Sequence, residues 1–144
     1  MKKVVRSFLK NNEWKYLLVK HVGKDVWSLP WGHIDEWESI YKAMKREIKE
    51  ELNLEINILW NTLWLDIENI KEKPAPVCTY KINFISEKGK KIKKLEYIFL
   101  AEIKSWDIEL QEKEISEYGL FTKDEVLWLN NTYLQVKEIL KKIA

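Results

Sequence analysis

Short runs of β-branched and aromatic residues, separated by polar turns, account for most of the chain. Such runs are typical of β-strands, because these side chains pack well on a pleated surface. The polar stretch 11–13 between the first two runs predicts a hairpin. The predicted strands cover 2–9, 15–20, 54–67, 77–86 and 94–104, with 26–30 as a short extended piece. Loops are predicted over 31–38, 87–94 and 109–117.

One segment in the middle of the chain has helical periodicity instead. Its apolar residues fall four apart, at Ile40, Met44, Ile48 and Leu52. Ser39 stands where an N-cap is expected, and Asn53 follows the last turn, where asparagine tolerates left-handed backbone. Shorter helical patterns close the chain at 123–128 and 132–143. Strands around one central helix, with helices at the end, predict a mixed α/β sandwich in a single domain over residues 1–144.

Composition narrows the class of protein. The chain has 144 residues, of which 46% are hydrophobic and 33% charged, enough for one core without disulfides or a structural metal. The single cysteine, Cys78, has no partner for an internal bridge, which favours a reducing compartment. A net charge of +2 is too balanced for a dedicated nucleic-acid binder or polybasic membrane binder. No apolar run is long enough to span a membrane, and Arg6 and Lys10 interrupt the basic N-terminal stretch, so we expect a cytoplasmic protein without a signal peptide.

Three glutamates of the predicted helix share one face. Glu47, Glu50 and Glu51 are spaced i, i+3 and i+4, whereas the apolar row lies on a different face. Like charges that converge in this way repel one another unless a cation lies between them, and Mg²⁺ or Mn²⁺ prefers oxygen ligands of this type. The alternative is a solvated helix face on which neighbouring lysines and Arg46 neutralise the glutamates.

The same glutamates belong to a longer motif. From Gly32 the chain runs through five residues to Glu38, then through seven to Arg46-Glu47-Ile48-Lys49-Glu50-Glu51-Leu52-Asn53-Leu54. This segment resembles the Nudix box, G-x5-E-x7-R-E-U-x-E-E-x-G-U, where U is a bulky aliphatic residue. Eight of its nine specified positions match, and Asn53 replaces the final glycine. The preceding Trp27-Ser28-Leu29-Pro30 resembles the W-x-L-P segment before the box in many members, so the chain is identified as a member of the Nudix hydrolase family.

The resemblance implies a fold, a reaction and a set of metal ligands. The implied fold is the Nudix α/β/α sandwich (α+β class), with a mixed β-sheet and a central catalytic helix. The implied reaction is the Mg²⁺- or Mn²⁺-dependent hydrolysis of a nucleoside diphosphate linked to a group X, which yields a nucleoside monophosphate and phosphorylated X. Glu47, Glu50 and Glu51 correspond to the metal ligands of the family, and the Gly32 loop supplies a backbone carbonyl near the metal.

Arg46 and His33 lie beside these ligands in the motif. The resemblance implies that Arg46 orients a glutamate, with Glu38 as the natural partner, rather than touching substrate. His33 is a candidate phosphate contact, although a solvent-exposed loop residue is the commoner case. The lysines within 88–94 are interpreted in the same way, as a solvated hairpin tip rather than an RNA-binding surface, because no aromatic residues alternate with them.

The general base and the substrate stay open at this point. The base varies within the family, so Glu50, Glu51 and the glutamates of the 112–117 loop are all candidates, and Glu114 is favoured within that loop. The expected partner is a small-molecule nucleotide, and the sequence does not distinguish among ADP-ribose, dNTPs, dinucleoside polyphosphates and nucleotide sugars. A homodimer is also compatible with the sequence. The alternative function is a Nudix-fold nucleotide-binding or sensing module with impaired catalysis.

Tryptophan is abundant where glycine is expected. The chain has 8 tryptophans and only 4 glycines, against a typical glycine usage of about 7%. Many family members have Gly-Gly and Gly-Glu where this chain has Trp31-Gly32 and Trp37-Glu38. The other tryptophans at glycine-like places are Trp14, Trp60, Trp106 and Trp128, whereas Trp27 fits its motif and Trp64 fits a strand pattern.

These tryptophans suggest a gene in which UGA is read as glycine. The alternative is that the tryptophans form core or stack on a substrate base. In the chain as written, Trp31 and Trp37 flank the metal loop, and tryptophan adopts left-handed backbone or approaches a ligand closely only at a cost that glycine does not have. We therefore expect weakened binding of metal or diphosphate in this form.

Overall fold

The structure is a computed structural model that describes residues 1–59 and 61–143. Its strands are β1 (Lys2–Lys10), β2 (Tyr16–His21), β3 (Trp31–His33), β4 (Ile56–Ile58), β5 (Cys78–Ile85), β6 (Lys91–Ile103) and β7 (Ile115–Phe121). Its helices are α1 (Ile40–Leu52), α2 (Lys123–Trp128) and α3 (Leu134–Ile143). Among the described residues, no helix has the length and apolar character needed to cross a membrane.

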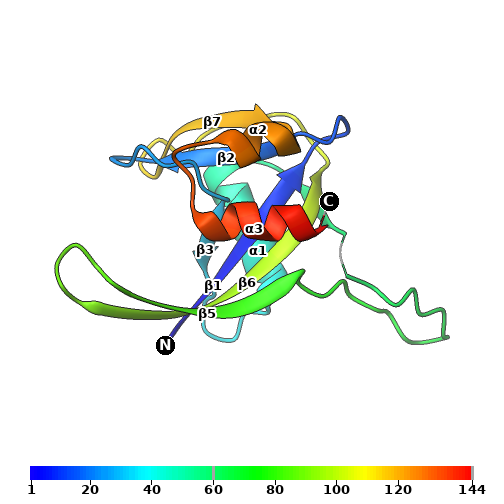
Figure 1. Cartoon of the computed structure of the whole chain (residues 1–144). Coiled ribbons are helices and arrows are strands. Elements are labelled where there is room, and N and C mark those ends of the chain that lie inside the picture. Colours follow the sequence, from blue (N-terminus) through cyan, green and yellow to red (C-terminus); the bar gives the residue numbers. More distant parts are fainter. Residues whose placement is uncertain (60, 144) are drawn as a thin grey trace.

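A seven-stranded mixed sheet forms the centre of the fold (Figure 1). The strand order is β4-β6-β1-β2-β7, with β3 added to β1 and β5 added to β6. β1 and β6 run parallel along the whole of β1, and the other pairings are antiparallel. Because β1 pairs with β3 through residues 4–6 and with β2 only through residues 9–10, its two ends have different neighbours.

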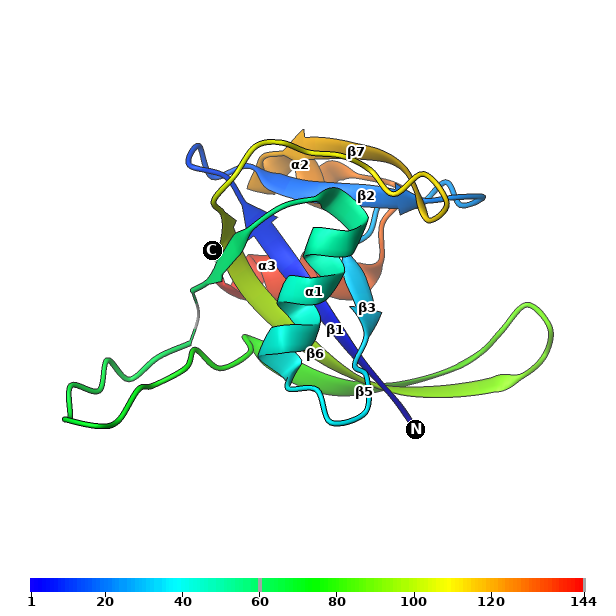
Figure 2. The same cartoon turned by 180° about the vertical axis from the view of Figure 1, so that it is seen from behind.

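The helices cover both faces of this sheet (Figures 1 and 2). Alternate side chains of a strand point to opposite faces, and the central strands follow this rule. Leu9 of β1 and Phe99 of β6 belong to one buried cluster with the apolar side of α1. Their neighbours Phe8 and Ile98 belong to a second cluster with α2 and α3. The expected α/β/α arrangement with a mixed sheet is therefore confirmed.

The central helix begins and ends where the sequence predicts. Ser39 is the N-cap, and its side-chain oxygen accepts the N–H of Lys42 at 3.1 Å. Asn53 is the C-cap, with φ of 56° and ψ of 36°, and its N–H donates to the carbonyl of Lys49. The apolar row is buried under the sheet, and Glu51 is buried with it. The helix thus presents its glutamates at the border between core and solvent.

The predicted strand over 54–67 is wrong beyond its first part. Among the described residues of this range, Ile56–Ile58 pairs with the end of β6, and the N–H of Leu59 still donates to the carbonyl of Leu100. The following segment turns away from the body of the molecule (Figure 1), and the Glu72 carboxylate accepts the N–H groups of Leu63 and Leu65 at 2.6 and 3.0 Å. Because a side chain satisfies these backbone groups, the segment needs no neighbouring strand.

Two strands lie where loops were predicted. β3 is a three-residue strand inside 31–38, and β7 begins in the last part of 109–117. β7 pairs with β2 from Tyr16–Phe121 to Lys20–Glu117, and the Lys20 ammonium lies 3.0 Å from the Glu117 carboxylate. The glutamates at 109, 112 and 114 precede β7 and Glu117 lies within it, so the local sequence is that of a polar loop although the strand itself has a single charged residue.

Candidate active site

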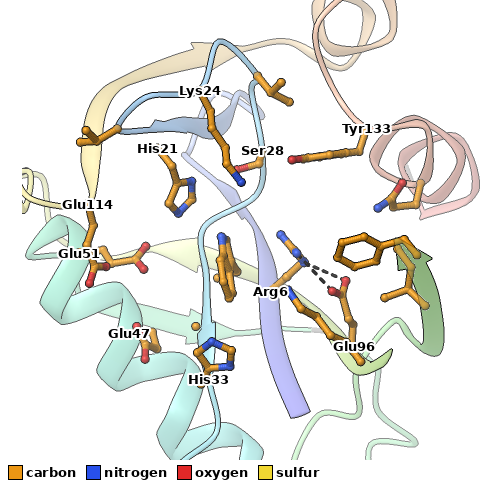
Figure 3. A pocket seen from close by; sticks show the side chains of 18 of the residues that line it. Arg6, His21, Lys24, Ser28, His33, Glu47, Glu51, Glu96, Glu114 and Tyr133 are labelled. Atoms are coloured by element: carbon orange, nitrogen blue, oxygen red, sulfur yellow. Dashed lines mark hydrogen bonds and ion pairs between the residues drawn. The ribbon is translucent and has the colours of Figure 1, made fainter. Parts of the chain in front are cut away.

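A cavity of about 800 Å³ opens where β3, α1, the β5–β6 hairpin and the loop before β7 meet. This volume is within the usual range for small-molecule sites. Figure 3 shows that carboxylates of Glu47, Glu51 and Glu114 lie at one end and that Arg6, Glu96 and Tyr133 lie at the other. Segments far apart in sequence therefore build a single cavity with two chemically different ends.

Gly32 brings β3 against the helix at the carboxylate end. Its backbone pairs with Val5 of β1, and the Glu47 side chain packs against its Cα. A Cβ at position 32 would overlap the Glu47 carboxyl group, so only glycine fits at this close approach. The backbone of Gly32 and the carboxylate of Glu47 are consequently neighbours.

Arg46 connects the loop before the helix to the helix itself. Its Nε and Nη2 donate to the two oxygens of Glu38 at 2.7 and 2.9 Å. Nη1 donates to Glu47 at 2.8 Å and to Glu50 at 3.3 Å, and Nη2 also donates to the carbonyl of His33 at 3.0 Å. A bidentate pair of this kind has a fixed orientation. Arg46 therefore holds the helix and the loop in one geometry.

Glu38 is the fixed partner in this arrangement. Hydrogen bonds from Arg46 hold the pKa of Glu38 below its usual range, against the opposing effect of burial. One oxygen of Glu38 also accepts the N–H of Asp35 at 2.9 Å, which closes the turn. The carboxylate is thus ionised and committed to the protein rather than to a ligand.

Glu51 differs from the other glutamates of the helix because it is buried. Only 3% of the residue is exposed, and its Oε2 has no hydrogen-bond partner. Burial, together with the charges of Glu47 and Glu114, raises the pKa of Glu51 to about 9. Burial also raises the pKa of Glu47, although the Arg46 ion pair opposes this effect. A buried carboxylate oxygen without a partner, next to two further carboxylates, fits a divalent cation with oxygen ligands.

Glu50 is placed differently from its neighbours. Its side chain is 55% exposed, contacts Arg46 and does not line the cavity. Within residues 1–59 and 61–143, no three His, Cys, Asp or Glu side chains are already clustered closely enough to hold a metal ion. The structure thus brings Gly32, Glu47, Glu51 and Glu114 together and leaves Arg46 and Glu50 at the edge of the site.

The opposite end of the cavity contains residues that the sequence did not single out. The guanidinium of Arg6 donates to the buried Glu96 at 2.8 and 3.2 Å, and the hydroxyl of Tyr80 donates to the same carboxylate at 2.6 Å. Lys94 lies beside them, and burial lowers its pKa. The sequence offers one signal of the cation end of the cavity: Arg6 is a charged residue inside an apolar stretch.

Trp31 occupies the middle of the cavity. The Arg6 guanidinium lies 5.1 Å and the Lys94 ammonium 4.9 Å from the centre of its ring. The rings of His21 and His33 lie 5.8 and 5.3 Å from the same ring. Burial and nearby cations lower the pKa of both histidines, so neither contributes a positive charge at neutral pH. Trp31 therefore contacts both cations and both histidines of the cavity lining.

The chain thus has a mixed sheet between helices, and two glutamates of its central helix line a cavity of a size typical of small-molecule sites. The sequence model of the NUDIX domain matches residues 2–143. The chain therefore belongs to the Nudix hydrolase family, as its sequence motif indicates. No curated protein sequence matches the chain.

Solved structures with this fold come from distant organisms. A hydrolase of the NUDIX family from Clostridium perfringens has a TM-score of 0.75 at 19% identity, over 99% of this chain and 97% of that one. An Ap4A hydrolase binary complex from C. elegans has a TM-score of 0.70 at 20% identity, over 99% and 94%. The NUDIX domain of Shewanella oneidensis NrtR complexed with ADP ribose has a TM-score of 0.66 at 20% identity, over 97% and 86%. At such identities the likeness establishes the fold.

Proposed function

We propose that the protein hydrolyses a nucleoside diphosphate linked to a group X, with Mg²⁺ or Mn²⁺, and releases a nucleoside monophosphate and phosphorylated X. The observation that carries this proposal is the buried Glu51, whose Oε2 has no partner and which lies beside Glu47 and Glu114 at one end of the cavity. An uncompensated buried carboxylate is costly unless it serves a ligand, so the site is better explained by chemistry than by folding.

The proposed metal ligands are Glu47, Glu50, Glu51 and the backbone carbonyl of Gly32. Glu51 offers a free buried oxygen, whereas Glu47 and Glu50 already accept hydrogen bonds from Arg46. A bound Mg²⁺ would neutralise the charge that develops on the diphosphate oxygens. Arg46 is the positioning residue in this proposal. Its bidentate contact with Glu38 fixes the guanidinium, and the guanidinium in turn holds the Glu47 carboxylate.

Glu114 is the residue that we assign as general base. Glu50 is held by Arg46 outside the cavity lining and Glu51 has a free oxygen, and both are assigned here as ligands. Glu114 remains as an exposed carboxylate on the cavity wall, where it can accept a proton from water and release it to solvent. Its backbone N–H donates to the carbonyl of Gln111, so a turn fixes the approach of this loop.

The other end of the cavity suits the rest of a nucleotide. Arg6 and Lys94 supply positive charge, and Phe84 and Tyr133 supply aromatic surface in the same lining. Cations suit phosphate groups, and aromatic rings suit a nucleobase. The site thus supports a small-molecule nucleotide as substrate, in line with the nucleotide-derived ligands of the C. elegans and Shewanella oneidensis proteins.

The test is release of nucleoside monophosphate from a pooled panel of ADP-ribose, dNTPs, dinucleoside polyphosphates and nucleotide sugars, with and without Mg²⁺. The protein would carry the substitutions W31G and W37G, which open the cavity and relax the metal loop. Glu51→Gln and Glu114→Gln should each lower kcat at least about 100-fold. Glu109→Gln, an exposed glutamate ahead of the same loop, is the matched control and should keep full activity. Equal rates in Glu51→Gln and the parent would contradict the proposal.

A second candidate is a nucleotide-binding or sensing module with impaired catalysis. The observation that favours it is the Trp31 ring, which lines the cavity and lies 5.1 Å from the Arg6 guanidinium and 4.9 Å from the Lys94 ammonium, where it covers both cations. The chain as written would then bind nucleotide without turnover. Calorimetric titration with ADP-ribose, beside the activity panel, separates the two: binding without product release in both the parent and the W31G/W37G variant supports the module.

We propose a cytoplasmic location and either a monomer or a homodimer as the working form. The support for the location is Cys78, a half-buried free thiol whose pKa burial raises, which is an unreactive cysteine suited to a reducing compartment. Sedimentation velocity at micromolar concentration would decide the oligomeric state, because a homodimer and a monomer differ twofold in mass.

A further inference from the structure

Three tryptophans have a backbone conformation that favours glycine. The φ angles of Trp14, Trp37 and Trp64 are 58°, 67° and 59°, all in the left-handed region. Among the described residues, the other non-glycine members of this group are Asn53 and Asn69. Asparagine is among the residues that tolerate this conformation, whereas a bulky aromatic residue there is a genuine outlier.

The side chains of these tryptophans do little to offset the strain. Trp37 is 98% exposed, Trp64 is 86% exposed and Trp14 is 57% exposed. Trp27, by contrast, is half-buried, and its ring packs edge-on against Phe121 with centroids 5.0 Å apart. Strained backbone persists only where surrounding contacts enforce it, and an exposed ring supplies few of them.

The turns themselves require the left-handed residue. The N–H of Trp14 donates to the carbonyl of Asn11 at 3.2 Å where the chain turns from β1 to β2. Trp37 lies inside the turn in which the N–H of Glu38 donates to the carbonyl of Asp35 at 3.0 Å. Backbone hydrogen bonds thus fix the left-handed residue in each of these two turns, whichever side chain it carries.

The third turn is fixed by a carboxylate. Trp64 lies between Leu63 and Leu65, whose N–H groups both donate to Glu72. A chain that presents consecutive N–H groups to one carboxylate needs a left-handed residue to curve around it. The sequence-based expectation that Trp64 belongs to a strand is therefore wrong, and its position is that of a turn glycine.

We infer that positions 14, 37 and 64 are glycine positions, and that the natural protein carries glycine there because its gene reads UGA as glycine. The inference is independent of the proposed function, since it rests on backbone conformation alone. It adds Trp64 to the residues suspected from the sequence. Trp60 lies outside the described residues, and Trp31, Trp106 and Trp128 are not among the residues with positive φ, so the argument does not extend to them.

The protein-level test compares glycine with alanine. The reference is the variant W14G/W37G/W64G. In this variant one of the three glycines at a time is replaced by alanine or changed back to tryptophan. Each such replacement should lower Tm by about 3 °C, because alanine and tryptophan both carry the Cβ that strains this conformation. Trp27→Gly in the same background is the matched control and should lower Tm through lost packing, which shows that glycine is not stabilising everywhere.

The gene-level test is the codon at each position. UGA at positions 14, 37 and 64, with UGG at position 27, is the expected result, together with glycine in the peptides of the protein isolated from its own cells. UGG at the three positions overturns the inference about the natural protein. Alanine variants as stable as the glycine reference overturn the backbone argument itself. Neither result depends on whether the protein hydrolyses a nucleotide.

Discussion

Glutamine at position 51 should stabilise the metal-free protein at neutral pH. The pKa of Glu51 is raised from an ordinary value of 4.5 to about 9, so between these values the folded protein holds a proton that the unfolded chain has released. The free energy of unfolding then falls by about 1.4 kcal/mol per pH unit. The stability due to this proton is fully present below pH 4.5 and is lost as pH rises to 9. At pH 7 the loss reaches at most about 3 kcal/mol.

Urea unfolding in EDTA at pH 5, 6, 7 and 8 measures this effect. Glutamine is close in shape to protonated glutamate and does not titrate, so Glu51→Gln should gain stability over the parent as pH rises, by about 1–3 kcal/mol at pH 7. Glu55→Gln, an exposed glutamate 3.1 Å from Lys49, is the matched control and should follow the parent at every pH. A stability difference between parent and Glu51→Gln that stays constant with pH would refute the assignment of Glu51 as a buried ionisable group.

Adding Mg²⁺ should reduce the stability advantage of Glu51→Gln over the parent. Mg²⁺ at about ten times its Kd stabilises a protein that binds it only when folded by about 1.4 kcal/mol. The parent should gain this amount, and Glu51→Gln, which lacks the charged ligand, should gain little. Binding should also release a proton, since Glu51 must ionise to act as a ligand. Equal stabilisation of both proteins by Mg²⁺ would place the cation elsewhere.

Three further substitutions test other parts of the structure. Arg46→Ala should raise the Mg²⁺ concentration for half-maximal activity at least about tenfold, because Arg46 is the link by which Glu38 fixes the helix glutamates. An unchanged Mg²⁺ titration would contradict this role. Arg6→Gln should lower the free energy of unfolding in urea by about 3 kcal/mol, because it leaves the buried Glu96 without its ionic partner. Arg6→Lys, which keeps the positive charge, should lose less. Ser39→Ala should cost about 1 kcal/mol by the same measurement through loss of the N-cap, and no change would mean that the cap is dispensable.

The central helix was predictable because its signals are local. Ser39 and Asn53 act on backbone groups within four residues, and the apolar row at spacing four needs only a sheet to cover it. The difference between the glutamates was also present in the helix geometry. At 3.6 residues per turn, Glu51 lies about 60° around the helix from the buried Ile48 and Glu50 about 160°. The burial of Glu51 and the exposure of Glu50 follow from this angle.

Strand pairing was less predictable because it depends on distant partners. The segment after Ile58 has the composition of a strand, but its described residues beyond Leu59 bond within their own loop: Asn61 pairs with Ala75, and the Glu72 side chain accepts from Leu63 and Leu65. β7 follows a glutamate-rich segment and forms a strand because β2 offers it an edge to pair with. The cation end of the cavity depends likewise on β1 lying parallel to β6, which brings Arg6 beside Glu96 across 90 residues. No local pattern encodes such contacts.

The arrangement of donors around the carboxylates sets the order in which a cation can be held. Glu51 has a buried oxygen, Oε2, that accepts no hydrogen bond, whereas Glu47 and Glu50 share Nη1 of Arg46. The other donors of Arg46 are bonded to Glu38 and to the carbonyl of His33, so these contacts hold the guanidinium outside the cavity. A cation therefore gains most at Glu51 first, and then competes with a fixed arginine for the remaining oxygens. The turn that contains residue 37 positions Glu38. Because Glu38 holds Arg46 and Arg46 holds Glu47, hydrogen bonds connect this turn to the proposed metal ligands.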